Sequence, residues 1–143
     1  MPSLPSHKKL TPEEFSAQLS QIMTHMTTGE IKRGKSFGIH FFKTSHHRIN
    51  ELIKPANEKG IWEARIDVRH PKTNAWVSKQ KSSTLFPTTW TEEILAAKLK
   101  EAYANSIQTT TYKKFGTTSC GIKVAFIFQD GVIASCYPIY EYL

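Results

Sequence analysis

The chain has 143 residues and a formal net charge of +7, with 39% hydrophobic and 22% charged residues. This length fits one domain, and the balance excludes a chain that is disordered throughout. No apolar run is long enough to span a membrane, and the first ten residues lack the apolar region of a signal peptide. Two cysteines, Cys120 and Cys136, are too few for a disulfide framework or, without histidines, for a zinc site.

The basic charge is the first indication of a partner. Lysine and arginine total 19 against 12 acidic residues, which favours a polyanion, with nucleic acid as the first choice. A merely soluble basic domain is the alternative. We expect a flexible tail at residues 1–10 and a single domain over residues 11–143.

The first half of the domain begins with a capped helix. Thr11 and Glu14 form a capping-box pattern, and the apolar spacing that follows predicts a helix over residues 12–26. Residues 29–38 combine three glycines with Lys32, Arg33 and Lys35, which is typical of a flexible basic loop. We expect a short strand at residues 39–42 and a helical turn or two over residues 46–54.

The second half contains two hairpins separated by a helix. Residues 61–68 alternate apolar and polar side chains, which predicts a half-buried strand, with residues 75–79 returning as its hairpin partner. Thr89 and Glu92 form a second capping-box pattern before a helix that ends near Asn105.

The last predicted hairpin joins residues 122–128 to residues 132–137 through Asp130-Gly131, a strong turn signal. Helices are not interleaved with parallel strands, so the fold class is α+β, an N-terminal helix with antiparallel sheets.

Several common catalytic motifs are absent from the sequence. It has no H-E-x-x-H, Cys-x-x-Cys, G-x-S-x-G or P-loop pattern, which argues against a zinc protease, a zinc deaminase, a serine hydrolase and a P-loop nucleotidase. It does have six histidines beside lysines and hydroxyl residues. Cleavage of RNA without a metal needs a base, an acid and a fixed cation, which two histidines and a lysine can supply.

Two histidine motifs resemble those of the EndoU endoribonucleases. The segment from His25 to Glu30 is similar to the family's H-x-x-x-G-E motif, and Gly38-Ile39-His40 is similar to its G-x-H motif. The segment from Lys79 to Ser83 resembles the K-x-x-x-S element. Thr84 to Pro87 with Trp90 resembles the S-T-x-F-P…W segment, and Asp130-Gly131 with the Ser135 to Pro138 segment resembles the closing D-G…[ST]-x-Y-P hairpin.

The resemblance runs from His25 to about Tyr140, and five elements occur in the family's order. It implies an EndoU-like fold, similar to that of RNase A-like toxins, in which antiparallel sheets form a cleft. His40 would then be the general base, His25 the general acid, and Lys79 the cation that stabilises the phosphorane, although the sequence leaves open which histidine is acid and which is base.

The resemblance also implies a substrate-binding set. Ser83 would hydrogen-bond the base edge, Tyr137 would stack on sugar or base, and Ser135 would lie near the phosphate. Lys81 lies on the same strand face as Lys79 and is the alternative candidate for its role; we expect it to bind substrate. The expected reaction is a transesterification at uridine that leaves a 2′,3′-cyclic phosphate and a 5′-hydroxyl.

The expected partner is RNA, either single-stranded or in a tRNA loop, and we expect a monomer without a membrane partner or a cofactor. Some family members are activated by Mn²⁺, so metal activation stays open, yet no carboxylate cluster indicates a catalytic ion. A small basic domain of this family is similar to the toxin domains that bacteria deliver into competitors, which implies an acidic immunity protein; a free-standing small ribonuclease is the alternative. The place of action would be the cytoplasm, of the producing cell or of a target cell.

Some residues depart from the family pattern or suggest a purely structural role. The stretch from Lys43 to Gly60 is longer and more polar than the family implies, and Ser135 stands where threonine is usual. Trp62, Trp76 and Trp90 are expected in the core, and His46-His47 on the surface.

Two other functions fit the same residues: a ribonuclease of another family with a convergent site, and an RNA-binding domain without catalysis.

Overall fold

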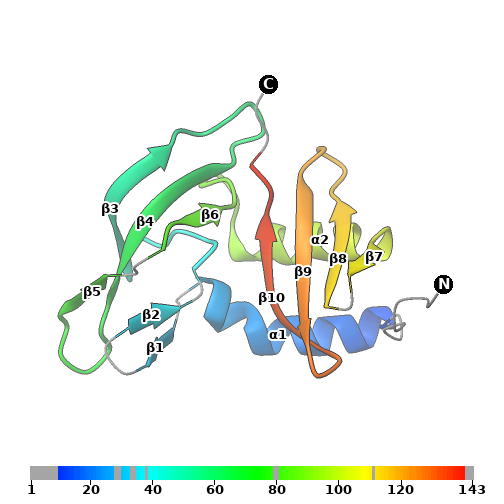
Figure 1. Cartoon of the computed structure of the whole chain (residues 1–143), viewed down its shortest axis with the longest axis horizontal. Helices are drawn as coiled ribbons and strands as arrows, with labels where there is room; N and C mark the ends of the chain where they lie inside the picture. Colours follow the sequence, from blue (N-terminus) through cyan, green and yellow to red (C-terminus); the bar gives the residue numbers. More distant parts are fainter. Residues whose placement is uncertain are drawn as a thin grey trace.

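The structure is a computed structural model. It describes residues 10–27, 30–32, 35–37, 39–78, 81–110 and 112–140. Within these ranges, two helices and three antiparallel sheets confirm the α+β class (Figure 1). In this part of the chain, no helix is long and apolar enough to cross a membrane.

Helix α1 (Pro12–Thr27) begins at the predicted capping box. The amide of Glu14 donates to Thr11 Oγ1 at 3.1 Å, and the amide of Thr11 donates to Glu14 Oε1 at 3.1 Å, so both groups find partners at the exposed helix end. Before the helix, the amide of Leu10 donates to Tyr103 Oη at 2.9 Å. Residues 1–9 lie outside the described residues.

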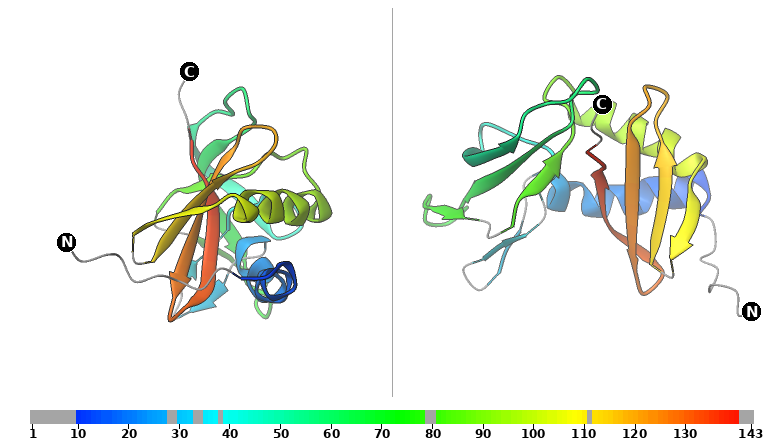
Figure 2. Two further views of the ribbon diagram at one scale, coloured as in Figure 1. Left: turned by 90° about the vertical axis from the view of Figure 1, so that its right-hand side faces the viewer. Right: turned by 45° about the horizontal axis from the view of Figure 1, so that its top comes forward.

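A four-stranded sheet in the order β10-β9-β8-β7 forms one half of the molecule. Its strands are β7 (Ile107–Thr110), β8 (Lys113–Thr117), β9 (Lys123–Gln129) and β10 (Val132–Pro138). Helices α1 and α2 (Glu92–Ala104) both pack on one face of this sheet, as the views of Figure 2 show. The turn between β9 and β10 is the predicted one, because Asp130 and Gly131 both have positive φ, 54° and 78°.

The main core lies between the two helices and this sheet. Phe15 of α1 stacks on Tyr103 of α2 with ring centroids 4.6 Å apart, and both contact Phe126 of β9 edge-to-face. One buried cation lies at this core: Lys114 is 5% exposed, and its ammonium lies over the rings of Tyr103 and Phe128. Burial lowers the pKa of Lys114 because it disfavours the charged form.

A second sheet is built around the strand predicted at residues 61–68. Strand β4 (Trp62–Arg69) pairs with β3 (His47–Lys54) on one side, and with β5 (Trp76–Ser78) and β6 (Ser83–Leu85) on the other. One face of this sheet packs a small core, whose buried members are Ile39, Trp62, Ala64, Ile66, Val68 and Leu85. The alternation along β4 therefore confirms the predicted half-buried strand.

The prediction of helical turns at residues 46–54 is wrong, because this segment is the edge strand β3. The register with β4 shifts between Ile49 and Glu51 and again between Leu52 and Lys54. These irregularities break the period of two, so the apolar residues recur at spacings that resemble a helix. His47, expected on the surface, is 2% exposed and its Nδ1 accepts from the amide of Lys43 at 2.9 Å.

The basic loop predicted at residues 29–38 contains a third, two-stranded sheet. Strand β1 (Glu30–Lys32) pairs with β2 (Lys35–Phe37), and β2 lies beside β5. Strands of three residues are too short to show a period, which is why sequence reasoning missed them. Positions 28, 29, 33, 34 and 38 lie outside the described residues.

Two further sequence predictions need correction. The N-cap of α2 is Thr91, whose side chain accepts from the amide of Ile94 at 3.1 Å, so the capping pattern assigned to Thr89 is wrong by two positions. Residues 39–42 are not a strand, since Ile39 has a φ of 69° and the segment turns there. Strands β7 and β8 were not predicted at all.

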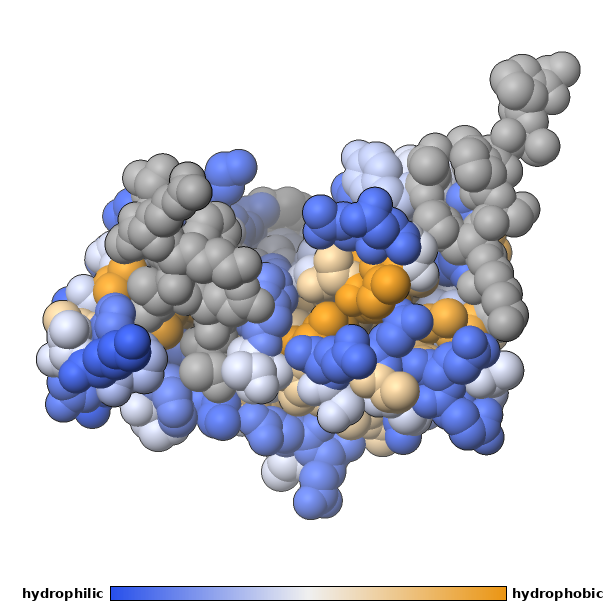
Figure 3. All heavy atoms as spheres, turned by 90° about the horizontal axis from the view of Figure 1, so that it is seen from below, coloured by the Kyte–Doolittle hydropathy of each residue, from blue (hydrophilic) through white to orange (hydrophobic). Residues whose placement is uncertain are grey.

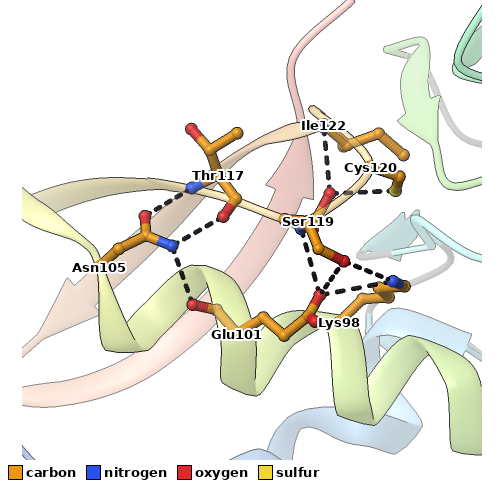
Figure 4. Close-up of polar contacts among 8 residues, drawn as sticks. Lys98, Glu101, Asn105, Thr117, Ser119, Cys120 and Ile122 are labelled. Carbon is orange, nitrogen blue, oxygen red and sulfur yellow. Dashed lines mark hydrogen bonds and ion pairs between the residues drawn. The ribbon is translucent and has the colours of Figure 1, made fainter.

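Polar contacts fix α2 to the β8–β9 end of the large sheet (Figure 4). Asn105 at the C-cap donates to the carbonyls of Glu101 and Thr117 at 3.0 and 2.7 Å, and its Oδ1 accepts from the amide of Thr117 at 2.9 Å. Glu101 Oε1 accepts from the amide and the hydroxyl of Ser119, and Lys98 Nζ donates to the same hydroxyl. The backbone hydrogen bond from Ser119, with smaller contributions from its hydroxyl and from Lys98, lowers the pKa of Glu101.

Figure 3 shows the molecule from below relative to the view of Figure 1. Apart from the grey residues, this surface is largely hydrophilic, and hydrophobic residues lie between the hydrophilic ones. A folded domain ordinarily exposes such a mixture of apolar and polar side chains.

Candidate active site

The segment that carries His40 is tied to the end of α1. The amide of Ile39 donates to the carbonyl of His25 at 3.1 Å, and the amide of His40 donates to the carbonyl of Met26 at 2.8 Å. These bonds satisfy carbonyls that the last helical turn leaves open. They also place the backbones of the two predicted catalytic histidines next to each other, although the chain between them makes the β1–β2 hairpin.

The imidazole of His40 is fixed from its other side by β6. Nδ1 of the ring lies 2.8 Å from the carbonyl oxygen of Thr84. The backbone carbonyl of His40 accepts from the amide of Phe86 at 2.8 Å. A carbonyl oxygen can only accept, so Nδ1 carries the proton. In the neutral ring the lone pair is then on Nε2, which is the protonation state that a general base needs.

A pocket of about 360 Å³ lies beside this imidazole, between the two four-stranded sheets. Its walls come from the His40 segment, from β4 and β6, and from β9 and β10. The lining residues are His40, Glu63, Ser82, Ser83, Thr84, Ile127, Ser135 and Tyr137. The ring of Tyr137 lies 5.6 Å from that of His40, centroid to centroid, at 33°. An aromatic face, an imidazole and several hydroxyls therefore share one hollow.

An irregularity in β10 presents Ser135 and Tyr137 to this pocket. The register with β9 shifts between Ile133, paired with Phe128, and Ser135, paired with Ile127. An extra residue in a strand reverses the alternation of the side chains that follow it. Ile133 and Cys136 are therefore both buried with the helices, while Ser135 and Tyr137 line the pocket on the opposite face of the sheet.

Glu63 is the acidic member of the pocket wall, and sequence reasoning missed it. Its carboxylate accepts a hydrogen bond from the Ser82 hydroxyl and lies 3.6 Å from Lys54 Nζ. Lys54 in turn lies over the ring of Tyr140, whose hydroxyl donates to the carbonyl of Pro55. The alternation of β4 predicts that Glu63 points away from the small core, but only the arrangement of the two sheets brings it to the pocket.

The structure brings together four of the seven predicted site residues, namely His40, Ser83, Ser135 and Tyr137. Ser83 is 2% exposed. Lys81 is exposed and precedes Ser82, but it is not among the residues that line the pocket. His25 is half-buried in the last turn of α1, adjacent to Ile39. Lys79 lies outside the described residues.

No group of three or more His, Cys, Asp or Glu side chains that could hold a metal ion occurs among the residues that the structure describes.

Comparison with known proteins places the chain in a family. The model of the family described as Bacterial EndoU nuclease matches residues 19–140, which is most of the chain. The chain belongs to the bacterial EndoU nuclease family. This membership confirms the predicted EndoU-type nuclease and decides against a ribonuclease of another family.

Two individual proteins are similar to this EndoU domain. A Bacillus cereus protein named Toxin is 30% identical over 81% of the chain, and the chain spans 22% of that protein's length. The solved structure of endoribonuclease Nsp15 encoded by Middle East Respiratory Syndrome Coronavirus has a TM-score of 0.48 and 13% identity, over 91% of this chain and 38% of the other. The likeness to Nsp15 is too low to carry an argument.

Proposed function

We propose that this EndoU nuclease cleaves RNA in the pocket beside His40, by transesterification and without a metal. The observation that carries the proposal is the contact of His40 Nδ1 with the Thr84 carbonyl at 2.8 Å, in a pocket that also contains Tyr137. The volume of this pocket, about 360 Å³, lies in the range of about 300–1,000 Å³ that is typical of small-molecule sites. The pocket brings together the His40 imidazole, the Tyr137 ring and several hydroxyls, which can contact a ribonucleotide.

In the proposed reaction His40 Nε2 removes the proton of the 2′-hydroxyl, whose oxygen then attacks the adjacent phosphorus. His25 protonates the departing 5′-oxygen, the P–O5′ bond breaks, and the products are a 2′,3′-cyclic phosphate and a 5′-hydroxyl. Lys79 supplies the positive charge that stabilises the phosphorane. The hydrogen bond between the His25 carbonyl and the Ile39 amide supports this pairing, because it holds the end of α1 against the segment that carries His40.

Recognition of the nucleotide follows from the rest of the pocket. Tyr137 offers a face for stacking, and Ser83 offers polar groups to the edge of an unpaired base, which is how proteins read single-stranded RNA. Ser135 is opposite Ile127 on the same wall as Tyr137, where it serves the phosphate. Lys81 holds a neighbouring phosphate from outside the pocket. The preferred base is uracil, in single-stranded RNA or a tRNA loop.

The test is cleavage of a uridine-containing oligonucleotide with and without EDTA, followed by analysis of the end groups. The proposal expects equal rates in both samples, cyclic phosphate ends and 5′-hydroxyl ends. A 3′-hydroxyl product, or cleavage that EDTA abolishes, would contradict the proposed chemistry. Tyr137→Ala is expected to lose turnover or the preference for uridine, whereas the exposed Tyr112→Ala serves as a matched control.

We also propose that the domain is the nuclease part of a toxin, since the similar Bacillus cereus protein bears that name and is far longer than the matched region. The domain would act in the cytoplasm of a target cell, and an acidic immunity protein would neutralise it by covering the pocket. Induced expression should arrest growth, and His40→Ala should remove the arrest. Growth that continues while RNA is cleaved in the same cells would contradict the toxin role.

A further inference from the structure

Away from the pocket, two arginines contact one tryptophan on the sheet of β3, β4 and β5. The guanidinium carbon of Arg48 lies 4.7 Å from the ring centroid of Trp76, and that of Arg69 lies 4.9 Å from it. Trp76 is half-exposed and belongs to neither hydrophobic core, so the expectation that it is a core residue is wrong. Trp62 is buried and Trp90 packs against the main core, as expected. We call Arg48, Arg69 and Trp76 the arginine–tryptophan cluster.

A buried carboxylate holds one of the two arginines. Arg48 Nε donates to Asp67 Oδ2 at 2.8 Å, and Asn50 donates to the other oxygen at 3.1 Å. The Asp67 side chain is 2% exposed, whereas that of Arg48 is 54% exposed. Arg48 thus presents its remaining donors to solvent from a fixed position, which lowers the ordering cost of binding a ligand.

The second arginine gives the cluster its net positive charge. Asp67 balances Arg48, but among the residues that the structure describes Arg69 has no carboxylate within ion-pair distance. Arg69 is exposed at the end of β4. Guanidinium groups bind phosphate through paired hydrogen bonds and stack on flat rings, and an indole adds a surface for an unpaired base. The chemistry of the cluster therefore fits a nucleotide.

The cluster lies on the same face of β4 as the pocket wall. Side chains of alternate residues share one face of a strand, so Arg69 lies on the face that carries Glu63. The rise of a strand places the two about 20 Å apart. Asp67, between them, pairs with Ser78 of β5, the strand that leads towards position 79. A strand of RNA that fills the pocket can thus reach the cluster several nucleotides away.

We propose that the arginine–tryptophan cluster is a second RNA-binding subsite, which holds the phosphodiester backbone several nucleotides from the scissile bond. The inference rests on the proposed function, since it takes RNA as the substrate. The subsite adds affinity for long single strands and takes no part in the chemistry.

The test compares equilibrium binding of a 20-nucleotide and a 3-nucleotide uridine-containing RNA, both with 2′-O-methyl groups that prevent cleavage, by fluorescence anisotropy. Arg69→Gln is the main variant because Arg69 makes no ion pair in the described chain, so the fold should persist. Lys100→Ala, which removes an exposed charge of α2, is the control for net charge.

Arg69→Gln should weaken binding of the long RNA about threefold to fivefold, as for an exposed ionic contact. It should also reduce the slope of log affinity against log salt by about 0.7. The affinity of Arg69→Gln for the short RNA should equal that of the wild type. Lys100→Ala should bind both RNAs as the wild type does, and Arg69→Lys should bind the long RNA more tightly than Arg69→Gln does. Equal weakening for both RNAs, or no weakening for the long one, would overturn the subsite. Because the RNAs are not cleaved, this result is independent of the products that test the proposed function.

Discussion

Gly116 of β8 offers the sharpest test of how α2 is seated on the large sheet. A Cβ built at this position would lie 1.8 Å from the carbonyl oxygen of Ala102 and 2.6 Å from its carbonyl carbon. Both atoms belong to the backbone of α2, so no side chain can rotate away. In Gly116→Ala the helix must therefore move from the sheet by more than about 1 Å to reach even a tight contact.

The stability lost through this movement can be estimated from the side chains that α2 buries. The helix contributes Leu95, Leu99, Ala102 and Tyr103 to the core, all with 3% exposure or less. Burying such side chains stabilises a fold by roughly 8 kcal/mol in sum, and a gap of about 1 Å already forfeits up to a half of the contact energy. We therefore expect Gly116→Ala to lower the free energy of unfolding by about 2–4 kcal/mol, a large part of a typical total.

Urea unfolding followed by circular dichroism measures this loss. Gly131→Ala is the matched control, because nothing lies within 4 Å of its Cβ position while its φ of 78° strains an alanine. That strain should cost only about 1–2 kcal/mol. If Gly116→Ala unfolds within about 0.5 kcal/mol of the wild type, the close contact of β8 with α2 is refuted.

Three further substitutions test other contacts by urea unfolding. Burial alone would raise the pKa of Asp67, but hydrogen bonds, first that from Arg48, lower it below its ordinary value. Asp67→Asn should therefore cost about 2 kcal/mol at pH 7. This loss should shrink as the pH falls below about 4, and a loss that does not change with pH would contradict the reasoning. Burial lowers the pKa of Lys114, so the native state binds fewer protons there than the unfolded chain. The wild type should then gain stability relative to Lys114→Met as the pH rises towards the ordinary lysine pKa of about 10.4, and a constant difference would refute the reasoning. Thr91→Ala should lower the free energy of unfolding by about 1 kcal/mol because it removes the N-cap, whereas Thr89→Ala should lower it little. A larger loss for Thr89→Ala than for Thr91→Ala would instead support the cap predicted from the sequence.

Local signals predicted the elements whose stability is itself local. The capping box of Thr11 and Glu14 and the turn at Asp130-Gly131 depend on neighbouring residues alone, and the structure has both where the sequence placed them. Strand β3 was mistaken because its irregular register with β4 hides the alternation, which is a property of the pair and not of the segment. Strands β7 and β8 lack any apolar period that would reveal them.

In the candidate site, too, local motifs could be predicted from the sequence, whereas contacts between distant segments could not. The histidine motifs and the Tyr137 segment predicted which residue types gather, and four of the named residues line one pocket. The sequence could not show that the shift in β10 turns Ser135 and Tyr137 to one side, because an extra residue is defined only against β9. Nor could it show Glu63 in the wall, since that placement needs two sheets that are far apart along the chain.

The central claim, that His40 removes a proton from the RNA in this pocket, is tested most directly by the single-turnover rate of His40→Ala. The substrate is a uridine-containing oligonucleotide, and His46→Ala, which removes a histidine outside the pocket, is the control. A general base contributes about 10²- to 10⁴-fold, so His40→Ala should slow cleavage by that factor while His46→Ala cleaves at the wild-type rate. Cleavage by His40→Ala within a few-fold of the wild type would contradict the account.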